Sequence, residues 1–134
     1  MTKKPSLKSL KKKVWKEFSI YIRHKYSRKG FVRCYTCGKV MEIKESQCGH
    51  GLGGRGNSIL FDEEICRVQC AQCNIFKGGN YDIFHMKLIK ENGLDWFSNK
   101  LRQKSKTKQF TIKELQDKLE YYKNENKKFE EDIV

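Results

Sequence analysis

Two Cys-x-x-Cys pairs constrain this chain more than any other feature of its sequence. Cys34 and Cys37 form the first pair and Cys70 and Cys73 form the second, with residues 38–69 between them. Each pair can present two thiolates to one tetrahedral ion, so together they fill the coordination sphere of a zinc ion. Because a catalytic zinc keeps one position open, a site of four cysteines is structural. We therefore expect a structural zinc that joins two distant segments of the chain.

The cysteines also bear on the cellular compartment. A secreted chain of 134 residues with six cysteines would suggest disulfides. The N-terminus is instead polar and lysine-rich, without the apolar segment of a signal peptide, and no apolar run approaches the ~18 residues of a membrane-spanning helix. We expect a cytoplasmic protein with reduced thiols and no membrane partner. Cys66 alternates with Val68 and should be a small core residue, whereas the role of Cys48, two residues before His50, stays open.

The charge of the chain favours a polyanionic partner. Its formal net charge is +13 at pH 7, and each phosphate neutralised by Lys or Arg releases condensed counterions. Residues 1–30 hold eleven Lys and Arg against one acid, and residues 100–108 add five with none, whereas residues 111–134 hold five Lys against seven acids. A solvated tail would also explain the basic N-terminus, and an anionic membrane surface could attract these segments. Nucleic acid, and DNA in particular, is the leading expectation.

The spacing of apolar residues predicts one α+β domain with helices at both ends. Residues 1–30 form a basic N-terminal helix, residues 31–92 the zinc-bearing core and residues 93–134 a C-terminal helical extension. Within the core we expect a hairpin over 31–41, a strand that carries His50, strand-like segments at 58–61 and 65–68, and helices over 70–77 and 81–91. Asn80 is the expected N-cap of the 81–91 helix. A further helix over 94–102 should bury Trp96 and Phe97.

The last helix carries a heptad pattern. Thr111 and Glu114 have the spacing of a capping box, which marks its start. The stripe that follows alternates steps of three and four and consists of Ile112, Leu115, Leu119, Tyr122, Asn126, Phe129 and Ile133. Two interpretations of this stripe stay open. In the first, residues 111–133 of two chains pair to form a homodimer. In the second, the stripe packs on the first helix of the same chain.

The segment between the cysteine pairs contains residues suited to phosphodiester hydrolysis. That reaction needs a base, a cation and groups that hold the strand. His50 begins a glycine-rich stretch, in which the backbone can approach a phosphate closely. Asn74 directly follows the last cysteine and offers an oxygen ligand to a hard cation. Arg55 can hold a phosphate with two parallel hydrogen bonds.

The order of these motifs resembles that of known nucleases. A Cys-x-x-Cys pair, a His before a glycine-rich loop and a final Cys-x-x-Cys-Asn resemble the HNH, or ββα-metal, nucleases. The Cys73-Asn74 junction is similar to that of the phage Holliday-junction resolvase endonuclease VII. A closer resemblance, over nearly the whole chain, is to the NinG (Rap) family of lambdoid phage recombination proteins. It rests on Leu10–Arg23, Cys34–Lys39, Gly49-His50, Arg55–Asn57, Phe61–Glu63, Gln69–Asn74, Gly79-Asn80 and Glu120–Lys123.

This resemblance implies an activity and a set of site residues. It implies a small ββα-metal core in which His50 is the general base and Asn74 binds a catalytic magnesium or manganese ion. Arg55 and Asn57 would complete the site, Arg55 on the phosphate and Asn57 on the loop. The implied activity is hydrolysis of phosphodiester bonds in branched DNA, such as a Holliday junction, during phage recombination in the host cytoplasm.

Two positions depart from the HNH pattern. Gly49 stands where an acidic residue or a His usually precedes the base as a metal ligand, and Asp62 is a substitute candidate. Ile65 stands where the pattern has its middle asparagine, and because Ile65 cannot hold a loop by hydrogen bonds, Asn57 would take that role.

Two other functions stay open. A zinc-ribbon DNA-binding accessory protein without catalysis would explain the zinc and the charge but would leave the glycine-rich insert and Asn74 without a role. A sequence-specific or nicking HNH enzyme of the homing type would cut according to sequence rather than branch geometry. His24 and His85 lie on expected helices, where an ordinary surface or core role is favoured.

Overall fold

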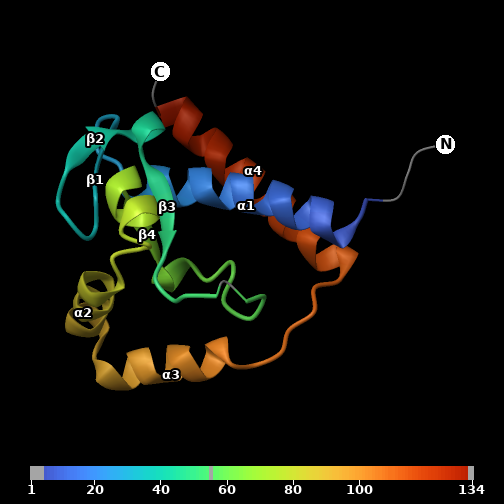
Figure 1. Ribbon diagram of the computed structural model, residues 1–134. Coiled ribbons are helices and arrows are strands. Elements are labelled where there is room, and N and C mark those ends of the chain that lie inside the picture. The colour runs from blue at the N-terminus through green and yellow to red at the C-terminus, as the bar shows by residue number, and fades with distance from the viewer. Residues whose placement is uncertain (1–4, 55, 133–134) are drawn as a thin grey trace.

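The computed structural model describes residues 5–54 and 56–132. These residues form an α+β fold, as predicted, with helices and two small antiparallel sheets (Figure 1). In chain order, with η for a short 3₁₀ or π helix, the elements are α1 (Leu7–Lys25), β1 (Phe31–Arg33), β2 (Val40–Glu42), η1 (Ile43–Glu45), β3 (Gln47–His50), η2 (Glu63–Ile65), β4 (Cys66–Gln69), η3 (Gln72–Phe76), α2 (Tyr81–Asn92), α3 (Leu94–Lys104) and α4 (Ile112–Asp132).

The first helix, α1, follows the predicted amphipathic pattern. The Ser6 hydroxyl accepts a hydrogen bond from the Ser9 N–H (3.1 Å) and caps the start of the helix. The buried residues of α1 recur at steps of four and are Leu10, Val14, Phe18 and Ile22. This apolar stripe forms the base of the largest core cluster.

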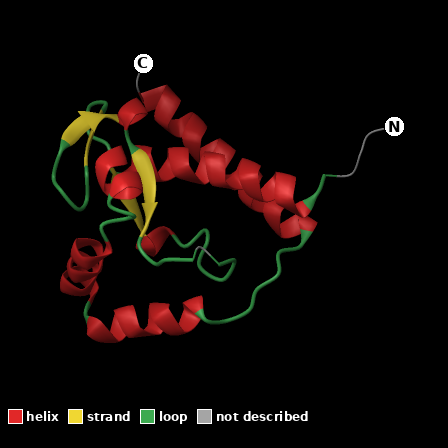
Figure 2. Cartoon of the chain, in the orientation of Figure 1, coloured by secondary structure: helices red, strands yellow, loops and turns green. Residues whose placement is uncertain are grey.

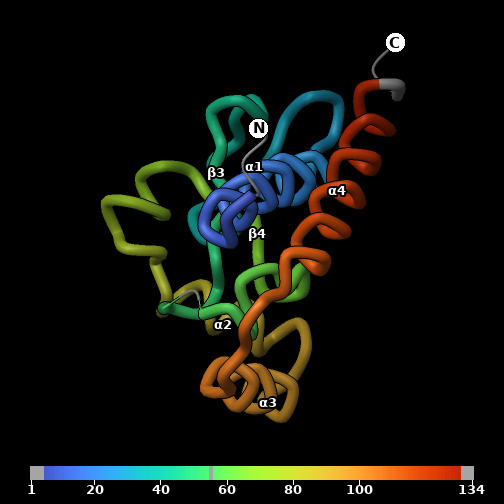
Figure 3. Tube along the Cα trace, turned by 90° about the vertical axis from the view of Figure 1, so that its right-hand side faces the viewer, coloured from blue at the N-terminus to red at the C-terminus, as the bar shows by residue number. Residues whose placement is uncertain are grey.

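α4 packs against α1, and Figures 1 and 3 both show the two helices side by side. Tyr122 of the heptad stripe meets the Phe18 ring edge-on, with centroids 5.3 Å apart. Asn126 donates two hydrogen bonds to Glu17, one to its backbone carbonyl (2.9 Å) and one to its carboxylate (2.8 Å). The stripe therefore packs on the first helix of its own chain, so a dimer through this face would have to displace α1. Ile133 lies outside the described residues.

The first cysteine pair lies in the turn of the predicted 31–41 hairpin. β1 and β2 pair antiparallel, with Val32 opposite Met41 and both side chains buried. In the turn, the Cys34 N–H donates to the Lys39 carbonyl (2.8 Å) and the Gly38 N–H donates to the Cys34 carbonyl (2.9 Å). Gly38 has a φ of 83°, a left-handed conformation that favours glycine.

β3 and β4 form a second hairpin, with His50 opposite Cys66. The connection between them contains turns and η2, so the strand predicted at 58–61 was wrong. Ile59 and Leu60 are both buried, but they belong to different core clusters, on the α2 side and on the α1 side respectively. In a run of turns, successive apolar side chains can point into two different clusters, so apolar residues in succession need not form a strand.

α2 and α3 follow one another at the corner of the molecule away from α4 (Figure 2). Gly93 ends α2, as predicted, with a φ of 95°. Asn80 occupies the N-cap position of α2, as predicted, and its carbonyl accepts the Phe84 N–H (3.0 Å), but its side chain makes no cap hydrogen bond and donates to the Cys73 sulfur (3.7 Å) instead. Phe97 is buried in α3, whereas Trp96 is only half-buried.

Candidate functional site

The four cysteines of the two pairs converge where the first hairpin meets η3. Their sulfur atoms all lie within 4.8 Å of one another. A tetrahedral zinc with Zn–S bonds of ~2.3 Å would separate its sulfurs by about 3.8 Å, and the sulfurs of Cys37 and Cys70 lie 3.7 Å apart. Cys34, Cys70 and Cys73 are buried and Cys37 is exposed. The predicted cluster is confirmed, and it can bind a structural metal such as zinc.

The surroundings of Cys34 favour a thiolate. Burial raises the pKa of Cys34, but hydrogen bonds from the Cys70 backbone and the Thr36 side chain, with further backbone bonds, outweigh burial and lower this pKa to about 6. The Cys73 N–H points at the Cys70 sulfur (3.5 Å), and the Asn80 amide points at the Cys73 sulfur (3.7 Å). Since zinc binds thiolates rather than thiols, these donors fit a metal bound at Cys34, Cys70 and Cys73. At Cys37 a backbone hydrogen bond from Lys39 lowers the pKa, but burial and hydrogen bonds with the other three sulfurs outweigh it and raise this pKa to about 12.

Cys48 and Cys66 lie outside this four-cysteine cluster. Both are buried in the core cluster that joins α1 and α4 to the second hairpin. Burial raises the pKa of the Cys66 thiol, and its hydrogen bond with Cys48 acts in the same direction. Cys66 is a core residue, as predicted, and Cys48 shares that role.

His50 ends β3 and is almost fully buried, with 5% of its surface exposed. Its Nε2 lies 2.8 Å from the Ile59 carbonyl oxygen. Its Nδ1 lies 3.2 Å from the Leu52 backbone nitrogen and 2.9 Å from the Leu52 carbonyl oxygen. Both ring nitrogens thus face the backbone of the loop that follows β3, and each lies within hydrogen-bond distance of a carbonyl oxygen.

Asn74 is tied to the opposite end of β3. Its Nδ2 donates to the Gln47 Oε1 (2.8 Å). Gln47 and His50 are three residues apart on one strand, so they are separated by about 10 Å along its axis and point to opposite faces. The two predicted catalytic side chains are therefore held by different groups, the Asn74 amide by Gln47 and the His50 ring by the Leu52 and Ile59 backbone.

The position before His50 has no room for a side chain. A Cβ on Gly49 would lie 2.0 Å from the Oε1 of Gln69. Gln69 is fully buried, and its Nε2 donates to the Thr36 hydroxyl (3.1 Å) and to the Gly79 carbonyl (2.8 Å). Gln69 therefore fills the space in which the HNH pattern expects a metal ligand. Sequence reasoning missed both Gln69 and Gln47, because only the register of β3 and β4 places these two residues opposite each other.

Asn57 holds the loop to the segment between α3 and α4. Its Nδ2 donates to the Lys108 carbonyl (3.0 Å). Beside it, the Ser58 carbonyl accepts a hydrogen bond from the Gln103 side chain (3.0 Å). Asn57 thus contacts the backbone of the linker between α3 and α4. A role of Asn57 in catalysis stays a prediction. Arg55 lies outside the described residues.

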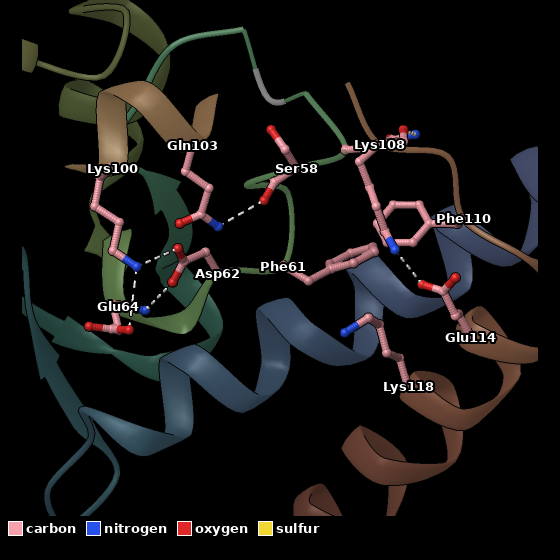
Figure 4. Close-up of a pocket in the computed structure, with 11 residues that line it drawn as sticks. Ser58, Phe61, Asp62, Glu64, Lys100, Gln103, Lys108, Phe110, Glu114 and Lys118 are labelled. Atoms are coloured by element: carbon pink, nitrogen blue, oxygen red, sulfur yellow. Dashed lines mark hydrogen bonds and ion pairs between the residues drawn. The ribbon is translucent and has the colours of Figure 1, made fainter. Parts of the chain in front are cut away.

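Asp62, the substitute ligand, is held by α3 in a polar cavity of about 440 Å³. Figure 4 shows the Lys100 ammonium facing Asp62 (2.7 Å) and Glu64 (3.3 Å). The side chains of Lys100 and Asp62 are 12% and 11% exposed, so this ion pair is shielded from water. On the other side of the cavity, Lys108 pairs with Glu114 (2.8 Å). The two Lys100 contacts hold the loop to α3, so Asp62 takes part in a structural ion pair.

His85, an expected ordinary helix residue, positions the loop that follows β3. Its Nε2 donates to the Gly51 carbonyl (2.7 Å), and its ring stacks on Tyr81 with centroids 5.3 Å apart. His24 stacks on Phe129 between α1 and α4 (centroids 5.1 Å apart). Burial lowers the pKa of His24, so this ring belongs to the helix packing in its neutral form.

A basic cavity of about 560 Å³ opens beside the N-terminal half of α1. Lys8, Lys11 and Lys12 line it together with Asn57 and Phe110. Three lysines from one helix, on a chain with a net charge of +13, form a surface suited to phosphates. Because Asn57 belongs to the loop that follows β3, this surface adjoins the loop.

The fold and the cysteine cluster define an α+β protein with four cysteines that can bind a metal ion. In the described part of the chain, no helix is long and apolar enough to cross a membrane. The chain belongs to the family described as Bacteriophage Lambda NinG protein, whose sequence model matches residues 2–132. No curated protein and no solved structure matches it. The predicted resemblance to the NinG family is thereby confirmed.

Proposed function

We propose that this chain is a metal-dependent endonuclease that cuts branched DNA during phage recombination. The observation that carries the proposal is the order β3, β4, η3, in which Asn74 follows the last cysteine of the metal cluster and bonds to the strand that ends at His50. This order is similar to the strand–strand–helix order of the ββα-metal nucleases, which supports the proposal. Membership in a bacteriophage protein family supports the phage context.

In the proposed reaction, His50 is the general base. In the tautomer that carries its proton on Nε2, Nδ1 takes a proton from the water that attacks phosphorus, while Nε2 keeps its hydrogen bond to the Ile59 carbonyl. That carbonyl fixes the ring and stabilises the positive charge that the ring gains. Because Nδ1 faces the Leu52 backbone, the loop has to shift before water reaches this nitrogen.

Asn74 would hold the catalytic ion. Its Nδ2 is engaged by Gln47, which leaves the Oδ1 as the atom for a hard cation. Magnesium or manganese bound there would offset charge on the phosphate and on the leaving oxygen. The four-cysteine cluster has no open position and fixes the start of η3, so its role in this scheme is to position Asn74.

A second candidate is a DNA-binding accessory protein without catalysis. The observation that favours it is the separation of the His50 ring from the Asn74 amide at opposite ends of β3. The basic cavity beside α1 would then bind DNA phosphates without any cleavage.

Incubation with a panel of DNA substrates separates these candidates. Linear, nicked, flap and four-way DNA are treated with the zinc-loaded protein in magnesium or manganese, beside His50→Ala and the matched control His24→Ala. The endonuclease proposal predicts cleavage of branched DNA by the wild type and by His24→Ala, but not by His50→Ala. Binding without cleavage would establish the accessory role, and cleavage that follows sequence rather than branching would indicate a homing-type enzyme.

A further inference from the structure

η3 exposes two large apolar side chains directly after Asn74. Ile75 is 58% exposed and Phe76 is 76% exposed, the highest value among the exposed large hydrophobic residues of the described chain. Single exposed apolar side chains are common on protein surfaces. Two in succession beside a candidate active site form a small exposed apolar patch, and exposed apolar patches mark binding sites.

This apolar pair is held in a fixed position. Backbone hydrogen bonds close the turns around it, from Lys77 to Gln72 (2.9 Å), Gly78 to Ile75 (3.1 Å) and Gly79 to Cys73 (2.9 Å). Cys73 is fully buried within the metal cluster, and the Asn74 side chain is bonded to β3. Phe76 therefore cannot turn into the core unless η3 breaks these contacts, and the structure presents it to solvent.

The surrounding charge indicates what the apolar pair contacts. Lys77 follows Phe76 and is exposed, and the whole chain carries a net charge of +13. A second copy of so basic a chain would be repelled, whereas a polyanion would be attracted. Nucleic acid combines phosphates with flat apolar base faces, on which aromatic side chains stack, and proteins insert Phe and Ile between bases to unstack them.

We propose that Ile75 and Phe76 form a wedge that enters DNA at a branch point and stacks on an unpaired or unstacked base. Unstacking is least costly where a base already lacks a neighbour, so the wedge would favour branched DNA over linear duplex. The inference rests on the DNA partner of the proposed function but does not require cleavage. In this proposal, Ile75 and Phe76, which directly follow Asn74, determine the preference for branched DNA over linear duplex.

The test measures binding without cleavage. A four-way junction with 2-aminopurine at the branch point, and a linear duplex of the same composition, are titrated with zinc-loaded protein in calcium instead of magnesium or manganese. The variants are Phe76→Ala, Phe76→Trp as the conservative replacement, and Leu94→Ala as a matched control. Leu94 is 64% exposed on α3 and far in sequence from η3.

The wedge predicts that Phe76→Ala loses affinity for the junction by about 5- to 150-fold, the range for one base–aromatic stack. It should also lose the 2-aminopurine signal while its affinity for linear duplex hardly changes. Phe76→Trp should restore both properties, and Leu94→Ala should match the wild type.

Three results would overturn the wedge. Phe76→Ala could keep the wild-type preference for the junction over linear duplex, or Leu94→Ala could lose as much affinity for the junction as Phe76→Ala. In the third, Phe76→Ala would weaken binding to anionic vesicles but leave the affinity for DNA unchanged. A wild-type protein that binds the junction through Phe76 but never cuts it in magnesium or manganese would refute the proposed activity and leave the wedge standing.

Discussion

At Gly49 the backbone passes so close to a buried side chain that only glycine fits. The Oε1 of Gln69 would lie 2.0 Å from an added Cβ, and the amide of Gln69 is fixed by Thr36 and Gly79. Gly49→Ala should therefore lower the free energy of unfolding by about 1–3 kcal/mol, because Gln69 must give up its place. Denaturant unfolding of the zinc-loaded protein measures this cost.

The matched control for this prediction is the same substitution in a Gln69→Ala background. Without the Gln69 amide the added methyl has room, so the cost of Gly49→Ala should be much smaller there. A double-mutant cycle extracts the difference. An equal cost in both backgrounds would show that Gln69 is not what excludes a side chain at Gly49.

At the scale of elements, the fold depends on the packing of α4 against α1. Leu115 is fully buried in the cluster that contains Leu10 and Phe18. Leu115→Ala should lower the free energy of unfolding by about 2–5 kcal/mol, because a buried leucine leaves a cavity. Lys123→Ala, at an exposed position of the same helix, should change it by no more than about 0.5 kcal/mol. If the two variants lose equal stability, or if Leu115→Ala mainly shifts a monomer–dimer equilibrium, the stripe serves an intermolecular contact instead.

The sequence predicts the helices and hairpins well where a local signal marks them. Ser6 caps α1, and the Thr111 hydroxyl accepts the Glu114 N–H (3.1 Å), as the capping box requires. Prediction fails where a distant contact decides the outcome. Asn80 has the right type and position for a cap, but the Cys73 sulfur takes its side chain, and no local pattern carries that information.

At the scale of the whole molecule, the four-cysteine cluster brings together the first hairpin and η3, which lie far apart in the sequence. One zinc per chain is expected, and removal of zinc by a chelator should lower the melting temperature and expose the hairpin and η3 to proteolysis, because metal binding is coupled to folding. Readdition of zinc should reverse both effects. Elemental analysis, circular dichroism and limited proteolysis measure them.

A matched pair of cysteine variants tests the same zinc site without a chelator. Cys73→Ser should lose zinc and stability together, since Cys73 belongs to the cluster. Cys48→Ala should keep one zinc, because Cys48 is buried in a different core cluster. A Cys73→Ser protein that retained zinc and full stability would show that the four sulfurs do not form the site.

The candidate site is only partly predictable from sequence. The spacing of the cysteines predicts their convergence, because one ion requires all four. The relation of His50 to Asn74 depends on the register of β3 and on the hydrogen bond to Gln47, which no spacing rule supplies. The family resemblance therefore suggests these two residues as candidates, but only the fold shows that His50 ends β3 and that Asn74 lies on η3 and bonds to Gln47.

Single-turnover cleavage of a four-way junction in manganese tests the central claim most directly, namely that His50 and Asn74 act together on one phosphate. His50→Ala and Asn74→Ala should each slow cleavage by about 100-fold or more, while junction binding and zinc content stay at the wild-type level. Asn124→Ala, at an exposed position of α4, should cut at the wild-type rate. Wild-type rates in both site variants, or no cleavage by a zinc-loaded wild type that binds the junction, would contradict the endonuclease and leave a DNA-binding protein.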